Sequence, residues 1–542
     1  MKIIGGAIGK DIHIAGILNF FAMVKSLGWD TCYLGPANSI STLISNIKKI
    51  NPDIIAISYR LSPETAEELL LQLKAAIEKA GFTNKKYIFG GTPSTAEIAE
   101  KTGIFDKIFT GGESKEEIIK YLTGKDLKTT RKFPDNLIDR IKWKRPILRH
   151  HFGLPSLEQT ISGAKEIAEA GILDVISIGP DQDAQEYFFH PELQISERKG
   201  DGGVPIRTPE DLKRIYKASR CGNYPLVRCY SGTNDLIKMA EMYIETINNA
   251  WCAVPLMWYN VLDKRSKRLL KDSITENQKL MKWHAERGIP VEVNESHHWS
   301  LRRAPDVIAV AMAYIAACNA RQMGVKNYVS QYMFNTPGET SPKMDLAKML
   351  AKIELIEALH DDNFKSFRQV RSGLLSFPPD LDMARGQLVS SIYLAMNLDP
   401  DIVHVVGYCE GSYIAKPKDI IESCKMVQQI IRNYKMGVPD MSLDPDVQAR
   451  KDKLKEEAFL LIDVIKSLEI SKDPLTDPII LCKAVEIGLL DAPDLKGNKY
   501  AKGEVCTKMI NGACYAINPK TKEPIYEKER VNCIKEVVIG NE

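Results

Sequence analysis

Short apolar segments alternate with amphipathic helical patterns along most of this 542-residue chain. Such alternation favours parallel sheets covered by helices, because each connection between parallel strands has to be about one helix long. In the first 125 residues we expect a flavodoxin-like, doubly wound parallel α/β sheet. Its predicted strands are residues 1–8, 31–34, 53–58, 87–90 and 107–110, and its predicted helices include residues 14–27, 40–50 and 63–80.

A second alternation follows residues 126–146, a charged segment that we interpret as a linker. Eight further strand patterns with helical patterns between them, over residues 147–440, predict a (β/α)8 TIM barrel. The predicted barrel strands are residues 147–152, 174–179, 226–230, 253–260, 291–295, 328–334, 370–377 and 402–408. Residues 441–542 predict a helical and turn-rich C-terminal extension. The sequence leaves open whether this extension completes the underside of the barrel or forms a dimer contact.

Charge and cysteine content narrow the class of partner and the compartment. Lys and Arg number 73 against 70 Asp and Glu, so a net charge of +3 gives no electrostatic reason to expect nucleic acid or an anionic membrane as a partner. The longest low-polarity stretch, residues 307–318, is too short to span a bilayer. Eleven cysteines without a C-x-x-C pair, and a first segment that fits a strand better than a secretion signal, lead us to expect a cytoplasmic protein.

The loop after the first predicted strand carries Asp11, His13 and Gly16 in the order D-x-H-x-x-G. A histidine on a loop can be a metal ligand, and an aspartate two residues earlier can hold the far ring nitrogen. Taken alone, such a pair is more often an ordinary surface pair. Its context favours a site, because the carboxyl ends of parallel strands form the ligand-binding edge of a doubly wound sheet.

Other predicted strands of the same sheet also end in small residues: Ser58, Gly90-Gly91 and Gly111-Gly112. Glycines at several strand ends suggest a large, flat ligand. The set lacks both a G-x-G-x-x-G turn leading into a helix and a P-loop, so it differs from a dinucleotide site. A flavodoxin-like domain without a ligand is the alternative.

This pattern resembles the cobalamin-binding domain shared by cobalamin-dependent mutases and methyltransferases, over roughly residues 1–125. The resemblance implies that His13 is the lower ligand of the cobalt, that Asp11 orients it, and that Ser58 contacts the nucleotide tail. The family often has S-x-L where this chain has Ser58-Tyr59-Arg60, so Arg60 is expected to face the corrin edge or a substrate carboxylate. The implied cofactor-binding residues are Asp11, His13, Gly16, Ser58, Arg60, Gly90, Gly91, Gly111 and Gly112.

Polar side chains gather at the carboxyl ends of the predicted barrel strands, where TIM-barrel active sites lie. Arg149 and Arg228 are costly in a water-poor barrel mouth unless they are paired. Two interpretations stay open: they bind a substrate carboxylate, or they form an internal salt bridge, for instance to Glu295 or Glu410.

The run Glu295, His297 and His298 invites a zinc site, but we do not favour one. Adjacent histidines on a strand end would direct their rings to opposite faces, and no third ligand has the spacing of a zinc motif.

Several barrel segments resemble the catalytic subunit of glutamate mutase (methylaspartate mutase). The matching segments are residues 224–235, 258–261, 293–295, 324–327, 483–493 and 499–500. The resemblance implies that Arg228 and Arg149 bind carboxylate, that Tyr259 lies at the substrate, and that Glu410 faces the ribose of the cofactor. The glutamate that receives the substrate's amino group in that family would fall near Ala253, so glutamate itself is in doubt as the substrate.

These observations predict an adenosylcobalamin-dependent radical mutase, an isomerase that acts on a small carboxylate-bearing or amino-acid substrate. Tyr259, Glu295 and His297 are expected to position the migrating group. The alternative is a corrinoid-dependent methyltransferase that uses methylcobalamin, and a third interpretation is a non-catalytic cobalamin-binding protein. The sequence leaves open whether the chain forms a homodimer or needs a reactivating partner.

Overall fold

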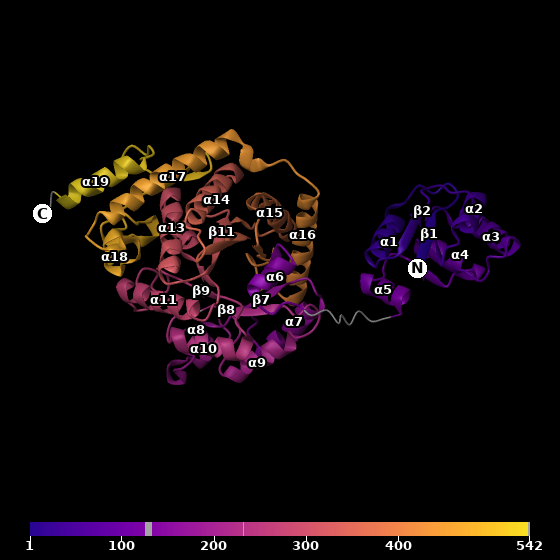
Figure 1. Cartoon of the computed structure of the whole chain (residues 1–542), viewed down its shortest axis with the longest axis horizontal. Coiled ribbons are helices and arrows are strands. Elements are labelled where there is room, and N and C mark those ends of the chain that lie inside the picture. The colour runs from indigo at the N-terminus through magenta and orange to yellow at the C-terminus, as the bar shows by residue number, and fades with distance from the viewer. Residues whose placement is uncertain (125–132, 231, 540–542) are drawn as a thin grey trace. The chain divides into compact units, whose positions relative to one another are not determined.

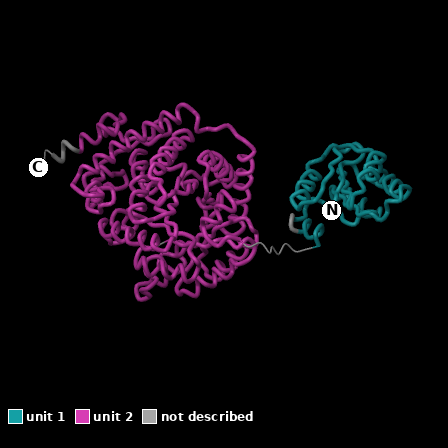
Figure 2. Tube along the Cα trace, in the orientation of Figure 1, with its two compact units in different colours: residues 1–130 teal, residues 131–542 magenta. Residues whose placement is uncertain are grey.

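The computed structural model describes residues 1–124, 133–230 and 232–539. The chain divides into two compact units, residues 1–130 and 131–542 (Figure 2). The predicted fold class is confirmed, because a five-stranded parallel α/β sheet is followed by an eight-stranded parallel barrel and a mainly helical C-terminal part. None of the helices among the described residues has both the length and the apolar character that a membrane crossing requires.

The N-terminal unit has a single parallel sheet with the strand order β2-β1-β3-β4-β5. Residue Gly5 of β1 lies opposite Tyr33 of β2 and Ala56 of β3, so β1 is an interior strand whose carboxyl end lies beside that of β3. The strands are β1 (Lys2–Ala7), β2 (Asp30–Tyr33), β3 (Ile54–Tyr59), β4 (Lys86–Gly91) and β5 (Lys107–Phe109). The helices are α1 (Ala15–Ser26), α2 (Ile40–Ile50), α3 (Pro63–Ala80), α4 (Pro93–Thr102) and α5 (Lys115–Thr123).

Capping residues explain why α2 and α3 begin and end where the sequence predicts. The Ser39 and Ser62 hydroxyls accept the backbone N–H groups three residues later, at 3.1 and 3.3 Å. These bonds satisfy N–H groups that the first turn of a helix leaves free. Helix α3 ends at Gly81, whose φ of 71° lies in the left-handed region.

The second unit is a (β/α)8 barrel whose strands follow the order β8-β7-β6-β13-β12-β11-β10-β9. Ladders join each neighbouring pair in this order, and the seam between β8 and β9 is closed by two single bonds: Ala250 N donates to Val227 O (3.0 Å), and Cys229 N donates to Asn249 Oδ1 (2.9 Å). The strands are β6 (Ile147–Phe152), β7 (Val175–Ile178), β8 (Leu226–Cys229), β9 (Cys252–Val254), β10 (Val291–Val293), β11 (Asn327–Phe334), β12 (Lys365–Ser372) and β13 (Ile402–His404).

The helices that alternate with these strands cover the outside of the barrel (Figure 1). The longer ones are α7 (Leu157–Glu169), α9 (Pro209–Ala218), α10 (Leu236–Ile247), α11 (Leu270–Ala285), α13 (Asp306–Gln322), α14 (Pro342–Glu357), α15 (Leu381–Ala395) and α16 (Pro417–Lys435). Two short helices follow strands directly, α8 (Gln182–Glu186) after β7 and α12 (Glu295–Leu301) after β10.

The amino-terminal end of the barrel is closed by an apolar layer. Helix α6 (Leu137–Trp143) lies in the segment predicted as a linker, part of which, residues 125–132, is outside the described residues. Leu137 and Ile141 of α6 pack in one cluster with Ile147 and other inward-facing residues of the strands. Because side chains alternate along a strand, Leu148 instead faces the surrounding helices. The polar part of the interior therefore lies toward the carboxyl end of the strands.

Three predicted barrel strands differ clearly from the observed ones. The strand predicted at residues 402–408 is only β13, which ends at His404. The strand predicted at residues 253–260 is only β9, because Pro255 follows and the chain turns. The strand predicted at 370–377 is β12, which starts five residues earlier, and the apolar residues after it form a 3-10 turn at Leu374–Ser376. Charged residues in the first half of β12 hid its start.

The C-terminal part packs against the outer helices of the barrel. Helix α17 (Pro445–Lys466) contacts α13 and α14, and Arg450 pairs with the buried Asp306 of α13 (3.2 Å). The hairpin β14 (Thr507–Ile510) and β15 (Ala513–Ala516) and the helices α18 (Pro478–Glu486) and α19 (Glu527–Ile539) complete it. The floor beneath the barrel strands comes from α6.

Candidate functional site

The loop between β1 and α1 presents His13 on a buried carboxylate. His13 Nδ1 donates to Asp11 Oδ1 at 2.8 Å, and the His13 side chain is 54% exposed while that of Asp11 is fully buried. The same carboxylate accepts the backbone N–H groups of His13 (2.8 Å) and Arg60 (2.7 Å). Asp11 thus ties the loop to the end of β3 and holds the proton on Nδ1, which leaves the Nε2 lone pair free to bind a metal.

The glycines of this edge fall into two groups. A Cβ at Gly91 would come within 2.4 Å of Thr95 Oγ1, and Gly111 has a φ of +90°, so the fold itself requires glycine there. At Gly16, Gly90 and Gly112, φ is not positive and a Cβ would meet no atom within 4 Å. Nothing inside the described part of the unit explains these three glycines, which leave bare backbone at the carboxyl edge of the sheet.

Two predicted residues and two unpredicted ones complete the edge. Ser58 is almost buried, and its hydroxyl has no hydrogen-bond partner among the described residues. The Arg60 side chain is exposed. Sequence reasoning missed Ile12 (69% exposed) and Leu61 (38% exposed), apolar side chains that flank His13 and Arg60 in the chain. A nitrogen ligand, bare backbone and exposed apolar groups fit a large flat metal cofactor such as cobalamin.

Inside the barrel, alternate strands contribute one charged layer. Glu292 Oε2 of β10 accepts from Arg228 Nη1 (2.9 Å) and Trp251 Nε1 (2.6 Å), and Arg149 Nη1 lies 3.5 Å away. Arg149 Nη1 also donates to Gln369 Oε1 of β12 at 3.0 Å. Of the two interpretations of the arginines, the structure has the internal salt bridge, and its partner is Glu292, not Glu295 or Glu410.

Mutual pairing governs the ionisation of this layer. Burial acts to raise the pKa of Glu292, but Arg228 and Arg149 outweigh it and hold the pKa below its ordinary value. Burial pulls the pKa of Arg149 well down, and the neighbouring Arg228 adds to that shift. The Glu292 carboxylate therefore stabilises two guanidinium groups that would otherwise be uncompensated charges.

Glu295 and His297 lie on α12, so the prediction that the two adjacent histidines end a strand is wrong. The rings of His297 and His298 do not point to opposite faces, because their centroids are 4.4 Å apart. Burial lowers the pKa of His297 to about 3, and the ring, held by Gln331, is neutral. Among the described residues no group of three or more His, Cys, Asp or Glu is placed to hold a metal ion.

Glu295 is fully buried and holds backbone in place. Its carboxyl oxygens accept Met257 N (2.8 Å) and Trp299 Nε1 (2.9 Å). Burial raises its pKa to about 7, against the opposing effect of Arg302. Glu295 therefore anchors the start of the loop that carries Tyr259.

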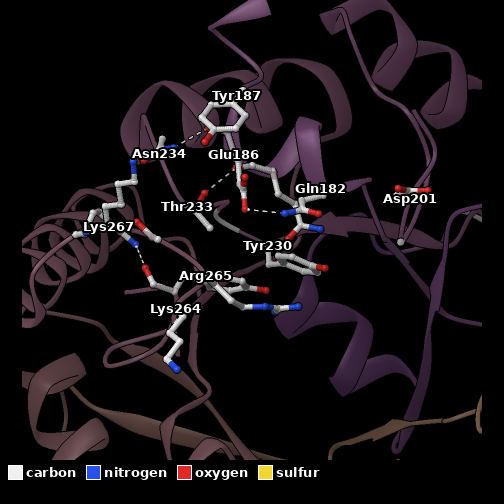
Figure 3. A pocket seen from close by; sticks show the side chains of 15 residues that line it. Gln182, Glu186, Tyr187, Asp201, Tyr230, Thr233, Asn234, Lys264, Arg265 and Lys267 are labelled. Atoms are coloured by element: carbon white, nitrogen blue, oxygen red, sulfur yellow. Dashed lines mark hydrogen bonds between the residues drawn. The ribbon is translucent and has the colours of Figure 1, made fainter. Parts of the chain in front are cut away.

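Tyr259 lines a cavity of about 990 Å³ at the carboxyl ends of β7, β8 and β9 (Figure 3). Its φ of 58° is held by two bonds, from Tyr259 N to Asp263 (2.7 Å) and from Arg268 to Tyr259 O (3.0 Å). The Arg265 guanidinium lies 5.2 Å from the Tyr259 ring centroid, and Tyr230 lines the same cavity.

A second cavity of about 420 Å³ lies at the carboxyl ends of β6, β7 and β13 and shares Gly202 with the first. His151 and Glu410 line it. Glu410 Oε1 accepts Gly407 N (2.7 Å) and lies 3.0 Å from His150 Nε2. Burial acts to raise the pKa of Glu410, but His150 and this backbone bond hold it below its ordinary value. Glu410 is thus an ionised carboxylate at the mouth of the barrel.

Sequence reasoning missed Arg371 because the misplaced strand put it at the wrong end of β12. It stands two residues after Gln369 and therefore faces inward, and the alternation Gln369-Val370-Arg371 was a usable signal. The upper interior also holds buried polar atoms without a hydrogen-bond partner among the described residues: Arg149 Nε, Ser177 Oγ, Arg228 Nε, Glu292 Oε1, Asn294 Oδ1, His298 Nδ1 and His404 Nδ1. Buried polar groups without a partner are typical of sites that bind water or a ligand.

Known proteins resemble the N-terminal unit. Residues 1–120 match the family model of the B12 binding domain. A trimethylamine corrinoid protein 2 from Methanosarcina acetivorans is 30% identical over 102 residues, 19% of this chain and 46% of that protein. A trimethylamine corrinoid protein from Methanosarcina barkeri is 27% identical over 99 residues, 18% of this chain and 45% of its own length. The chain thus spans less than half the length of these relatives.

A solved structure, the novel cobalamin-binding protein from Desulfitobacterium hafniense DCB-2, matches with 21% identity and a TM-score of 0.20, over 22% of this chain and 57% of that one. The family match and the corrinoid relatives agree with the exposed His13, its buried Asp11 and the bare glycines. The N-terminal unit is a B12-binding domain.

Proposed function

We propose that this chain is a cobalamin-dependent mutase whose barrel binds a small carboxylate-bearing substrate. The observation that supports it is the charge inside the barrel. Arg149, Arg228 and Arg371 project inward, and Glu292 is the one carboxylate on the inward strand positions that the structure describes. Surplus positive charge in an enclosed interior is costly without a partner and favours an anionic ligand.

His13 is the proposed cobalt ligand, through Nε2. Asp11 fixes its tautomer and raises its basicity, Ser58 offers a free hydroxyl to the nucleotide tail, and the bare glycines let the macrocycle approach the backbone. Bound adenosylcobalamin supplies the radical that starts a carbon-skeleton rearrangement. The remaining tasks belong to the protein: to hold the substrate and to exclude water.

Each barrel residue has a distinct proposed task. The apolar layer over α6 closes the floor to water. Neutral His297 and the hydroxyl of Tyr259 orient the migrating group by hydrogen bonds, whereas Glu295 acts from behind by holding the loop of Tyr259. Glu410, held by Gly407 N, offers a carboxylate to hydroxyl groups at the mouth.

A methyltransferase is the second candidate, because the corrinoid relatives are named for trimethylamine. Methylammonium donors are cations, and an interior with surplus guanidinium groups repels them. That argument favours the mutase.

The decisive experiment incubates the full chain with adenosylcobalamin and a panel of small carboxylates and amino acids, and follows isomerisation by NMR. We expect turnover in the dark that illumination abolishes. A parallel reaction contains methylcobalamin and a thiol. Thiol-dependent loss of the methyl group without any isomerisation would replace the mutase with the methyltransferase.

Cofactor binding has its own test, which does not depend on turnover. Gly90→Leu fills bare surface without crowding the fold, and equilibrium dialysis should show at least about tenfold weaker adenosylcobalamin binding. Gly386→Leu, at an equally open position on α15, is the matched control and should bind like the wild type. Equal binding by both variants would remove Gly90 from the cofactor site.

A further inference from the structure

Arg371 differs from the other two inward arginines of the barrel. Its neighbours in the sheet register are Met333 of β11 and His404 of β13. Its charge reaches across the mouth: after burial, it is among the groups that lower the pKa of His151, His297, His298 and His404. Arg371 therefore lies near these histidines, beside His404 at the carboxyl end of the barrel.

The guanidinium of Arg371 has no carboxylate partner. Only its Nε makes a hydrogen bond, to the carbonyl oxygen of Ser372 at 3.2 Å, and no acidic side chain among the described residues lies within ion-pair distance. Burial lowers its pKa, although Glu410 and Glu292 oppose that shift. By contrast, Arg149 and Arg228 share Glu292. Both terminal nitrogens of Arg371 are free for a planar, two-oxygen ligand.

The histidine rings near Arg371 add no charge to its surroundings. Burial keeps His297, His298 and His404 neutral, because it lowers the pKa of each ring. Asn294 Oδ1, His298 Nδ1 and His404 Nδ1 are buried without partners and can meet the uncharged polar groups of a ligand.

We propose that Arg371 is the carboxylate anchor of the barrel, and that Arg149 and Arg228 are positioning residues already committed to Glu292. The reaction this anchor serves rests on the proposed function, but the binding assignment does not. The proposed carboxylate anchor is therefore on β12, and not on β6 or β8, where the resemblance to glutamate mutase places it.

The first test measures carboxylate binding alone, on the full chain without cobalamin, with succinate and propionate as probes in calorimetry. Arg371→Ala should weaken binding about tenfold or more, and Arg371→Lys should recover only part of it because an ammonium lacks the fork of donors. Arg214→Ala, which removes an exposed arginine paired with Glu158, should bind like the wild type. Wild-type affinity in Arg371→Ala, or no binding of either probe by the wild type, overturns the assignment.

The second test separates anchoring from a structural role through the melting temperature. Arg371 is only partly exposed and has no carboxylate partner among the described residues, so the Tm of Arg371→Ala should be equal to or above that of the wild type. Succinate should then raise only the wild-type Tm. Arg228→Ala should lower the Tm, because it takes a partner from buried Glu292. An equal loss in both variants overturns the assignment. Succinate binding that depends on Arg371, without any isomerisation, would reject the mutase and keep the anchor.

Discussion

The two candidate sites of this chain are built on contrasting physical plans. At the sheet edge of the N-terminal unit, one buried carboxylate, Asp11, holds one exposed ring, His13, and three glycines leave bare backbone beside them. In the barrel, the charged groups are buried against each other and come from strands far apart in the sequence. An edge of that kind tolerates side-chain loss with little cost to the fold, whereas a buried network couples binding to stability.

The largest expected effect tests the buried network. Glu292→Ala leaves Arg149 and Arg228 as uncompensated charges and should lower the free energy of unfolding of the barrel by about 3–5 kcal/mol. Urea unfolding followed by tryptophan fluorescence measures it, because Trp251 and Trp299 are buried there. The matched control is Glu158→Ala, which breaks an exposed pair and should cost less than about 1 kcal/mol. Similar losses of unfolding free energy in both variants would show that the buried charge network does not couple to the stability of the barrel.

The pH dependence of Glu295 is the second test. The folded state keeps the Glu295 proton up to a pKa of about 7, whereas the ordinary value is 4.5. Its contribution to the free energy of unfolding is therefore fully present at low pH and is lost as the pH rises between these values, by roughly 3 kcal/mol.

Glu295→Gln removes this titration. The difference in unfolding free energy between wild type and variant should decline from pH 4.5 to pH 7 and be flat above about pH 8. Urea titrations at several pH values measure the difference. A difference that does not change with pH would show that Glu295 is ionised throughout and would remove this burial effect from the barrel.

Asp11→Ala tests how far the stability of the sheet edge depends on the buried Asp11 carboxylate. The change leaves the N–H groups of His13 and Arg60 without their acceptor, and should lower the local stability of residues 1–124 by about 1–3 kcal/mol. Hydrogen exchange on the full chain reports it. Cobalamin affinity should decline about 10–100-fold. The control is Asp30→Ala, which removes an exposed carboxylate. Equal losses of stability and of cobalamin affinity in both variants would show that Asp11 has no particular role.

His13→Ala should have the smallest effect on stability. The ring is 54% exposed and its removal should change the free energy of unfolding by less than about 0.5 kcal/mol. The absorption spectrum of bound cobalamin should nevertheless change, because the proposed lower ligand is gone. A spectrum identical to that of the wild type would exclude His13 as the cobalt ligand.

Local signals account for the parts that sequence reasoning predicted well. The D-x-H-x-x-G motif spans six residues, and Asp11 and His13 meet through a bond between near neighbours. Helices α2 and α3 begin and end as predicted because their caps lie beside them in the chain. The barrel strands were recognised one by one, with errors at β9 and β12, where a proline and charged residues blurred the pattern, and at β13, which is shorter than predicted.

The sequence by itself determined the fold class and the composition of the loop that carries Asp11 and His13, because both follow from short-range periodicity and from contacts between close neighbours. Only the tertiary structure decided which charges in the barrel are partners. Arg228 and Glu292 are 64 residues apart, and they meet because the strands of a barrel bring alternate inward positions to one level. The same closure leaves Arg371 without a carboxylate partner among the residues that the structure describes, which no local pattern reveals.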